Sequence, residues 1–378
     1  MLRRATHSVG MAALTLAAAA CAQTIRNRRL VRTPLKSHGP IAEKVSVLMP
    51  ARNEEGRIRP TLEDLLQQID LPHVEFLVLN DASTDHTAAI VQSYAMRDSR
   101  LSLIEGVDEA PPPGWLGKNW ACHRLSQRAT GSVLVFVDAD VRFRPHAIAA
   151  SIQMLRDQSL DLLSPYPQMI AETWLERIVQ PLVVWSWMSL LPLDAVETKP
   201  YASLAAANGQ FIAADARAYR VSGGHRGVAA NVIEDVGLLR LMKRHGFKGA
   251  PANGAYIASC RMYEGRSQLW SGYTKSLWSA FGSPAGSVAV VSLLSLTYIT
   301  PPLLILLGPD RLSRTLGVLG YAAGVTARTT VASATHEKTW PDALAHPVSI
   351  AVLTAMTAMS WRGRRAGTLR WRGRPISR

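Results

Sequence analysis

Apolar and polar positions along residues 45–140 follow a pattern that predicts strands and helices in alternation. Short runs rich in Val, Ile, Leu and Phe, typical of buried strands, occupy residues 45–50, 74–79, 101–104 and 132–137. Apolar residues recur at helical spacing between these runs, over residues 58–69, 87–96 and 121–127. Strands that alternate with helices form a parallel, doubly wound sheet, so the pattern predicts an α/β domain.

Polar residues directly follow three of these predicted strands. They are Asn53, Glu54, Asp81, Asp138 and Asp140. Ligands of open α/β sheets bind beyond the carboxyl ends of the strands, so we expect one cleft to collect these side chains. Each residue taken alone also has an ordinary explanation, as a turn residue or a helix cap.

The two acids after the strand at 132–137 indicate a metal site. Asp138 and Asp140 are two residues apart, so in extended backbone their side chains point the same way. Two carboxylates that face one spot repel each other unless a cation or a proton lies between them. The pair therefore suggests a divalent cation with oxygen ligands, Mg or Mn, and an ordinary Asp-rich turn after a strand is the alternative that the pair alone leaves open.

Two further segments carry candidate chemistry. The loop at 111–120 is shaped by proline and glycine and holds Lys118 between two tryptophans, where it could meet a phosphate or simply be solvated. Glu234 and Asp235 begin a predicted helix that runs to residue 245. The helix dipole favours acids at that position, and the same position could present a general base to the cleft.

Apolar stretches at both ends of the chain predict membrane segments. Residues 9–22 form a small-residue run, and residues 284–308 are apolar throughout and long enough to span. Residues 316–334 are a weaker candidate because they include Arg328, and residues 348–361 are short. Residues 174–188 are rich in tryptophan but interrupted by Pro181, so they predict either an interfacial helix or a core helix.

Charge orients these segments. The chain has 42 Lys and Arg against 28 Asp and Glu, yet 48% of its residues are hydrophobic. This combination favours a membrane protein facing anionic lipid over a nucleic-acid-binding protein. Basic residues after the first apolar run, ending at Lys36, and seven arginines in 362–378 predict cytoplasmic placement of the domain and the tail. A cleaved signal peptide ending near Ala22 is the alternative, and it would export the domain.

The chain therefore divides into four predicted parts. These are an N-terminal membrane anchor with a basic linker at 1–40, an α/β domain at 41–283, C-terminal transmembrane segments at 284–361 and a basic cytoplasmic tail at 362–378. The three cysteines are far apart and odd in number, so they predict no disulfide framework.

Residues 45–281 resemble the GT-A glycosyltransferases of family 2. The resemblance rests on four motifs in order: residues 50–55, residues 80–85, Asp138-Ala139-Asp140 and Glu234-Asp235. The segment Gly114–Trp120 together with Asn208-Gly209-Gln210 is similar to the membrane-bound branch that contains hopanoid-associated and carotenoid glycosyltransferases. The Gln-x-x-Arg-Trp motif of processive synthases is absent from the sequence, which makes polymer synthesis a less favoured activity.

This resemblance implies a GT-A fold and inverting, metal-dependent transfer of a hexose from a nucleotide sugar, UDP-hexose, to a lipid acceptor at the membrane. It implies donor binding by Pro50, Ala51, Asn53, Glu54, Asp81, Lys118 and Asp138. It implies the metal at Asp140, catalysis by Asp235 with Glu234 beside it, and an acceptor side formed by Asn208, Gly209, Gln210, Trp270 and Lys275. A polyprenyl phosphate acceptor and a non-catalytic membrane scaffold remain as alternatives.

Overall fold

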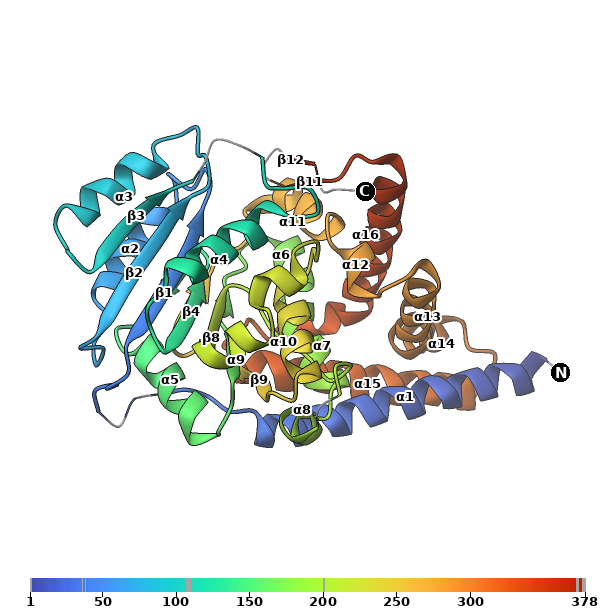
Figure 1. The fold of residues 1–378 in the computed structure, drawn as a ribbon. Coiled ribbons are helices and arrows are strands. Elements are labelled where there is room, and N and C mark those ends of the chain that lie inside the picture. Colours follow the sequence, from blue (N-terminus) through green and yellow to red (C-terminus); the bar gives the residue numbers. More distant parts are fainter. Residues whose placement is uncertain are drawn as a thin grey trace.

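The computed structural model describes residues 2–35, 37, 39–106, 110–199, 201–371 and 374–375. Lys36, Arg372 and Arg378, which belong to the predicted basic linker and tail, lie outside these residues. A seven-stranded sheet of order β3-β2-β1-β4-β8-β6-β9 forms the centre of the fold (Figure 1). Its strands are β1 (Val45–Ala51), β2 (Val74–Asn80), β3 (Leu101–Glu105), β4 (Val133–Val137), β6 (Leu162–Tyr166), β8 (Phe211–Asp215) and β9 (Gly249–Asn253).

The sheet is mostly parallel, as predicted, and only β8 runs antiparallel to its two neighbours, β4 and β6. Because side chains alternate across a strand, Val47 and Met49 pack on one face of the sheet and Leu48 on the other. One face is covered by α2 (Ile58–Leu66), α3 (Thr87–Ala95) and α5 (Ala147–Asp157). The other is covered by α4 (Gly117–Arg128), α9 (Ala216–Val221) and α10 (Glu234–Arg244).

A second, three-stranded sheet lies beside the first, in the order β5-β10-β7. Its strands are β5 (Val141–Phe143), β7 (Gln168–Met169) and β10 (Ala258–Cys260). Short helices connect the α/β domain to the long helices: α6 (Trp174–Val179), α7 (Leu182–Leu190), α8 (Leu193–Thr198), α11 (Gly265–Thr274) and α12 (Leu277–Ala280). The short η1 (Gly224–Val228) lies between α9 and α10 in the chain and packs against α4 and α10. The predicted helix at 174–188 is thus two helices, α6 and α7, with Pro181 between them. Trp185 and Trp187 of α7 are buried in the core, which supports the core-helix interpretation of that segment.

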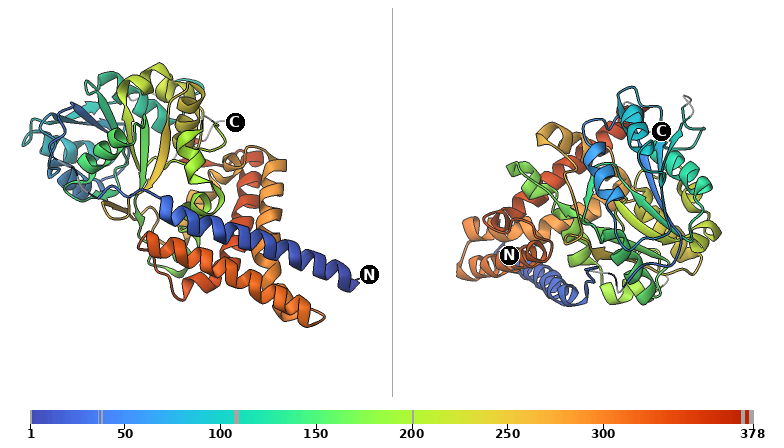
Figure 2. Two further views of the ribbon diagram at one scale, coloured as in Figure 1. Left: turned by 90° about the horizontal axis from the view of Figure 1, so that it is seen from below. Right: turned by 90° about the vertical axis from the view of Figure 1, so that its left-hand side faces the viewer.

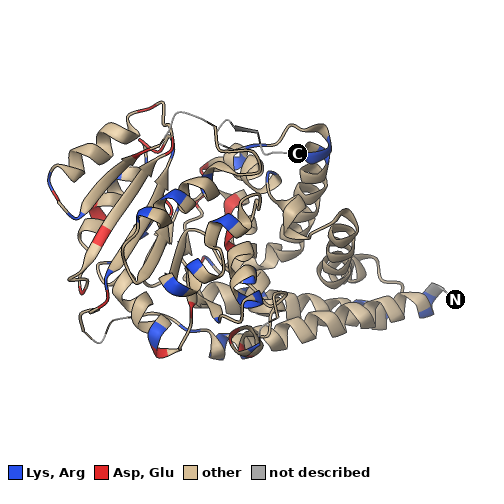
Figure 3. Cartoon of the chain, in the orientation of Figure 1, with Lys and Arg blue, Asp and Glu red and all other residues tan. Residues whose placement is uncertain are grey.

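The long helices extend from one side of the α/β domain (Figures 1 and 2). They are α1 (Leu2–Leu30), α13 (Pro284–Leu294), the π-helical turn η2 (Ser295–Ile299), α14 (Thr300–Leu307), α15 (Arg311–Ala334), the short η3 (Asp342–Ala345) and α16 (His346–Ala366). Beyond them the tail forms a small hairpin of β11 (Arg370–Trp371) and β12 (Arg374–Pro375). Three helical stretches of the described chain are long and apolar enough to cross a membrane, Arg3–Leu30, Pro284–Leu307 and Asp342–Ala366. Figure 3 shows the ribbon of α13 and α14 without a charged residue.

The last apolar segment differs from its prediction. We expected 348–361 to be short, but the helix begins near residue 342 and continues to Ala366. It continues because Pro347 fits the first turn of a helix and the arginines at 364 and 365 lie in its last turn, where cations are favoured. The weaker candidate at 316–334 belongs to α15, which lies along α1 and buries Arg328.

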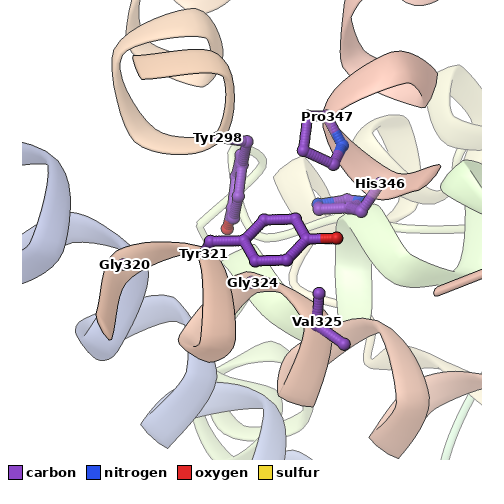
Figure 4. A pocket seen from close by; sticks show the side chains of 7 residues that line it. All are labelled: Tyr298, Gly320, Tyr321, Gly324, Val325, His346 and Pro347. Atoms are coloured by element: carbon purple, nitrogen blue, oxygen red, sulfur yellow. The ribbon is translucent and has the colours of Figure 1, made fainter. Parts of the chain in front are cut away.

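A narrow hollow lies where η2, α15 and α16 meet (Figure 4). It is lined by Tyr298, Gly320, Tyr321, Gly324, Val325, His346 and Pro347. Gly320 and Gly324 permit the close approach, because a Cβ at either position would come within 3.1 Å of Pro301 or Tyr298. The helices are therefore packed closely at the end of the bundle that meets the α/β domain.

Candidate active site

The loops after β1 and β2 are joined to each other at the edge of the sheet. Asn53 adopts a φ of 54°, and its side-chain Oδ1 accepts a hydrogen bond from the Thr84 backbone N–H at 2.8 Å. The Asn53 N–H in turn donates to the Ser83 hydroxyl at 3.0 Å, and the Glu54 N–H donates to the Thr87 hydroxyl at 2.8 Å. These contacts hold both loops in one arrangement beyond Pro50 and Ala51, the last two residues of β1.

Asp81 lies at the end of β2 and is buried. Its Oδ1 accepts a charge-assisted hydrogen bond from Arg124 of α4 at 3.0 Å. The guanidinium of Arg124 also lies over the Trp120 ring, 5.5 Å from its centroid. The arrangement fixes Asp81 against α4.

A closed group of charges lies between α4 and α10. The Lys118 Nζ is 2.8 Å from Asp138 Oδ1 and 2.9 Å from Glu234 Oε1, so it bridges the two acids. Burial raises the pKa of Asp138 to about 6, against the effect of Lys118. Burial also opposes ionisation of Glu234, but the Lys118 ammonium lowers its pKa below the ordinary value. Lys118 therefore keeps a negative charge at the start of α10.

Asp235 is held beside this group by backbone donors. Its Oδ2 accepts from the Gly209 N–H at 2.8 Å and its Oδ1 from the Val236 N–H at 2.7 Å. Burial, followed by the charge of Glu234, raises the pKa of Asp235 to about 7. A carboxylate of that pKa is suited to accept a proton near neutral pH.

Gly209 permits this close packing. A Cβ at this position would lie 2.9 Å from Glu234 Oε1 and 3.0 Å from Lys118 Nζ. The loop that carries Gly209 meets the end of β4, where the Asp138 N–H donates to the Gln210 carbonyl at 3.2 Å. The antiparallel β8 thus brings its starting end to the same edge as the carboxyl ends of the parallel strands.

Asp140 differs from its neighbours because its charge is poorly matched. Its Oδ1 is buried without a hydrogen-bond partner, and the cation nearest its Oδ2 is Arg57, at 3.7 Å. The described residues contain no group of three metal-ligating side chains. A site completed by a diphosphate needs only one or two carboxylates, as is usual for Mg²⁺ in phosphoryl sites. Asp140 fits such a metal through its unpaired oxygen.

The residues predicted for the acceptor side fall into two places. Asn208 and Gln210 are buried and hydrogen-bonded to each other at 2.9 Å, and Gln210 also donates to the Cys260 Sγ at 2.9 Å. Trp270 and Lys275 lie on α11 and at its end, next to α6 and α16. The structure therefore separates two buried bracing residues from two residues near the long helices.

Arg57, Arg124 and Tyr166 were not predicted as site residues. Arg57 lies between Asp140 and the segment that leads to α11. Burial, followed by the charge of Asp235, raises the pKa of Tyr166 well above its ordinary value. Arg57 lies between the motif at 50–55 and the helix predicted to begin at residue 58, so its place beside that motif could have marked it as a site residue. The sequence gives no comparable signal for Arg124 or Tyr166, because only the fold places them near the acids.

Comparison with known proteins identifies relatives of this arrangement. Residues 46–187 match the family model described as Glycosyl transferase family 2. A 4,4'-diaponeurosporenoate glycosyltransferase of Staphylococcus haemolyticus is 30% identical over 261 residues, 66% of each chain. The enzyme of that name from Staphylococcus aureus strain MRSA252 is 31% identical over 269 residues, 70% of this chain and 68% of the relative. The matched region thus covers about two thirds of the length of these relatives.

Among solved structures, a mannosyltransferase from Pyrobaculum calidifontis in complex with GDP-Man and Mn²⁺ has a similar fold. The TM-score is 0.58 at 17% identity, over 94% of this chain and 99% of that one. This likeness supports the GT-A fold predicted from the sequence.

Proposed function

The chain belongs to glycosyl transferase family 2 and is a glycosyltransferase, and on that premise we propose that it transfers a hexose from UDP-hexose to a lipid acceptor with inversion. The observation that carries the proposal is the Lys118, Asp138, Glu234 and Asp235 group at the sheet edge, with the unpaired oxygen of Asp140 nearby. Relatives named for 4,4'-diaponeurosporenoate support an isoprenoid acceptor, of carotenoid or hopanoid type.

Asp235 acts as the base in this proposal. The acceptor hydroxyl attacks the anomeric carbon from the face opposite the diphosphate, the new glycosidic bond forms as the bond to the diphosphate breaks, and Asp235 takes the hydroxyl proton. The Gly209 and Val236 N–H groups hold its two oxygens, so the carboxylate is oriented before the acceptor arrives. With a carboxylate acceptor no proton needs to be removed, and Asp235 then orients the acceptor.

Asp140 holds a divalent metal in this proposal. When bound, Mg²⁺ or Mn²⁺ neutralises charge that gathers on the departing diphosphate. Lys118 keeps Asp138 and Glu234 together, and Asp81, braced by Arg124, faces the nucleoside side of the donor. Asn53 and Glu54 shape the donor loop through their contacts with Thr84 and Thr87.

The apolar helices support a membrane location. Three helical stretches are long and apolar enough to span, and the first one carries basic residues at its C-terminal end, Arg26, Arg28 and Arg29. By the positive-inside rule, this distribution favours a multi-pass protein of the cell membrane with its catalytic domain on the cytoplasmic face. Nucleotide sugars are available in that compartment.

The test uses purified full-length protein in detergent, with UDP-hexoses, Mn²⁺ and lipid extracts as acceptors. Asp235→Asn removes the base, so we expect transfer to fall by about 10²–10⁴-fold while UDP binding stays within a few-fold of the wild type. Asp140→Ala should lose the Mn²⁺-dependent part of UDP binding. Asp157→Asn, an exposed acid at the end of α5, is the matched control. Transfer by Asp235→Asn at the rate of the control would contradict the assignment.

A further inference from the structure

Arg57 is held loosely, unlike the other cations at the sheet edge. Its Nη1 is 3.7 Å from Asp140 Oδ2 and 3.5 Å from the Met262 carbonyl oxygen. Its Nη2 is 3.4 Å from Glu264 Oε1 and 3.3 Å from Gln268 Oε1. Ordinary charge-assisted hydrogen bonds are shorter, at roughly 2.7–2.9 Å, so each contact of this guanidinium is weak and replaceable.

The other cations near the sheet edge already have closer partners within the protein. Lys118 bridges Asp138 and Glu234 at under 3 Å, and Arg124 pairs with Asp81 at 3.0 Å. Arg52 donates to the Asp81 and Ala82 carbonyl oxygens, at 2.6 and 3.0 Å. A diphosphate brought to Asp140 adds negative charge beside an acid, and Arg57 is the cation placed there with weak contacts to exchange. A guanidinium also matches phosphate oxygens in a bidentate manner.

Apart from Asp140, the groups that now contact Arg57 belong to one segment, 262–268, which we call the strap. The strap leads from β10, beside Asp140, into α11, which packs near α6 and α16. Its own bonds include the Glu264 N–H to Gln268 Oε1 at 3.0 Å and the Gly265 N–H to Glu176 Oε1 at 2.6 Å. Arg57 is thus the link between the metal acid and the segment that enters the helices on the acceptor side.

We propose that Arg57 is a donor-binding residue that leaves the strap for the diphosphate when the donor binds, so that donor binding loosens residues 262–268 on the acceptor side. The inference rests on the proposed function, because it assumes a diphosphate donor at Asp140. The strap groups and the diphosphate compete for the Arg57 guanidinium, so stronger contacts with one weaken binding of the other. Removal of the strap acid should therefore strengthen diphosphate binding.

The first experiment measures binding of inorganic pyrophosphate and of UDP to full-length protein in detergent, with Mn²⁺ and separately with EDTA. Arg57→Gln should weaken both ligands by at least tenfold and leave uridine binding unchanged. Glu264→Gln should tighten both by about two- to fivefold, because the competing charge is gone. Arg59→Gln removes an exposed arginine two residues away on α2 and should change nothing.

The second experiment follows amide hydrogen exchange of the strap. Pyrophosphate with Mn²⁺ should speed exchange at 262–268 in the wild type, whereas in Arg57→Gln exchange should be fast already and insensitive to the ligand. Pyrophosphate carries no base or sugar, so this exchange result does not depend on which nucleotide sugar is the donor. If UDP-hexose is not the donor, transfer from it would be absent, but pyrophosphate would still speed exchange in the strap. Unchanged pyrophosphate binding in Arg57→Gln would overturn the proposal. So would weaker binding in Glu264→Gln, a variant that remains informative if Arg57→Gln fails to fold.

Discussion

The two sides of the candidate active site differ in how closely their charged groups are paired. On the α10 side, Lys118 lies within 3 Å of two acids, and backbone N–H groups hold both oxygens of Asp235. On the strap side, Asp140 keeps a buried oxygen without a partner, and Arg57 has contacts of 3.3 Å or longer. Paired charges keep a geometry in place before the substrate arrives, whereas weakly paired ones can exchange partners when it does. The α10 side is therefore suited to catalysis, and the strap side to binding and release.

The strongest test of this difference removes the central cation from each side. Lys118→Met leaves Asp138 and Glu234 uncompensated, so we expect the free energy of unfolding to fall by about 3–5 kcal/mol and transfer to be lost. Arg57→Met breaks only long contacts and should cost less than about 1 kcal/mol. Denaturant unfolding in detergent measures both variants. Equal losses of unfolding free energy in the two variants would mean that the charges on the two sides are paired equally strongly.

The pH profile sharpens the comparison next. Burial and Glu234 raise the pKa of Asp235 to about 7, so below pH 7 the base is mostly protonated and inactive. Turnover should rise about tenfold per pH unit up to pH 7 and level off above it. Initial rates at saturating donor and acceptor test this. Glu264→Gln alters only the strap side, so it should leave the midpoint in place. A flat profile in the wild type would leave Asp235 an orienting role only.

A smaller effect is expected from crowding the α10 side. The added methyl group of Gly209→Ala would meet Glu234 Oε1 at 2.9 Å and Lys118 Nζ at 3.0 Å. We expect a loss of about 1–3 kcal/mol in unfolding free energy and a turnover roughly tenfold lower, because the charged group must shift. Gly56→Ala lies on the strap side of the donor loop with nothing within 4 Å of the new Cβ, and should change neither quantity measurably. Similar behaviour of the two variants would contradict the close packing at Gly209.

The sequence predicted the residues of this site better than the contacts between them. Strand ends are local features of the sequence. Hydrophobic periodicity, together with the rule that ligands bind beyond the carboxyl ends of parallel strands, therefore predicts that Asp81, Asp138 and Asp140 share one sheet edge. The bridge of Lys118 to Glu234 joins residues 116 positions apart, and the contact of Arg57 with Glu264 joins residues 207 apart. No short-range pattern encodes such pairs, because they depend on how β8 and α10 return to the edge. The resemblance assigned Asn208 and Gln210 to the acceptor side, and only the fold shows that they are buried against each other.

The smallest expected effect on UDP affinity concerns Asn53, in the loop after β1 on the strap side. Asn tolerates its φ of 54° better than most residues with a Cβ do, and its Oδ1 accepts a hydrogen bond from the Thr84 N–H. Asn53→Ala should lose both advantages and cost about 2 kcal/mol in unfolding free energy, whereas Asn53→Gly keeps the backbone conformation and should cost about 1 kcal/mol. Because the oxygen already bonds within the protein, UDP affinity should change by less than about threefold in Asn53→Gly. A larger loss of UDP affinity at unchanged stability would mean that Asn53 contacts the nucleotide directly. Part of the strap side would then be as preorganised as the α10 side.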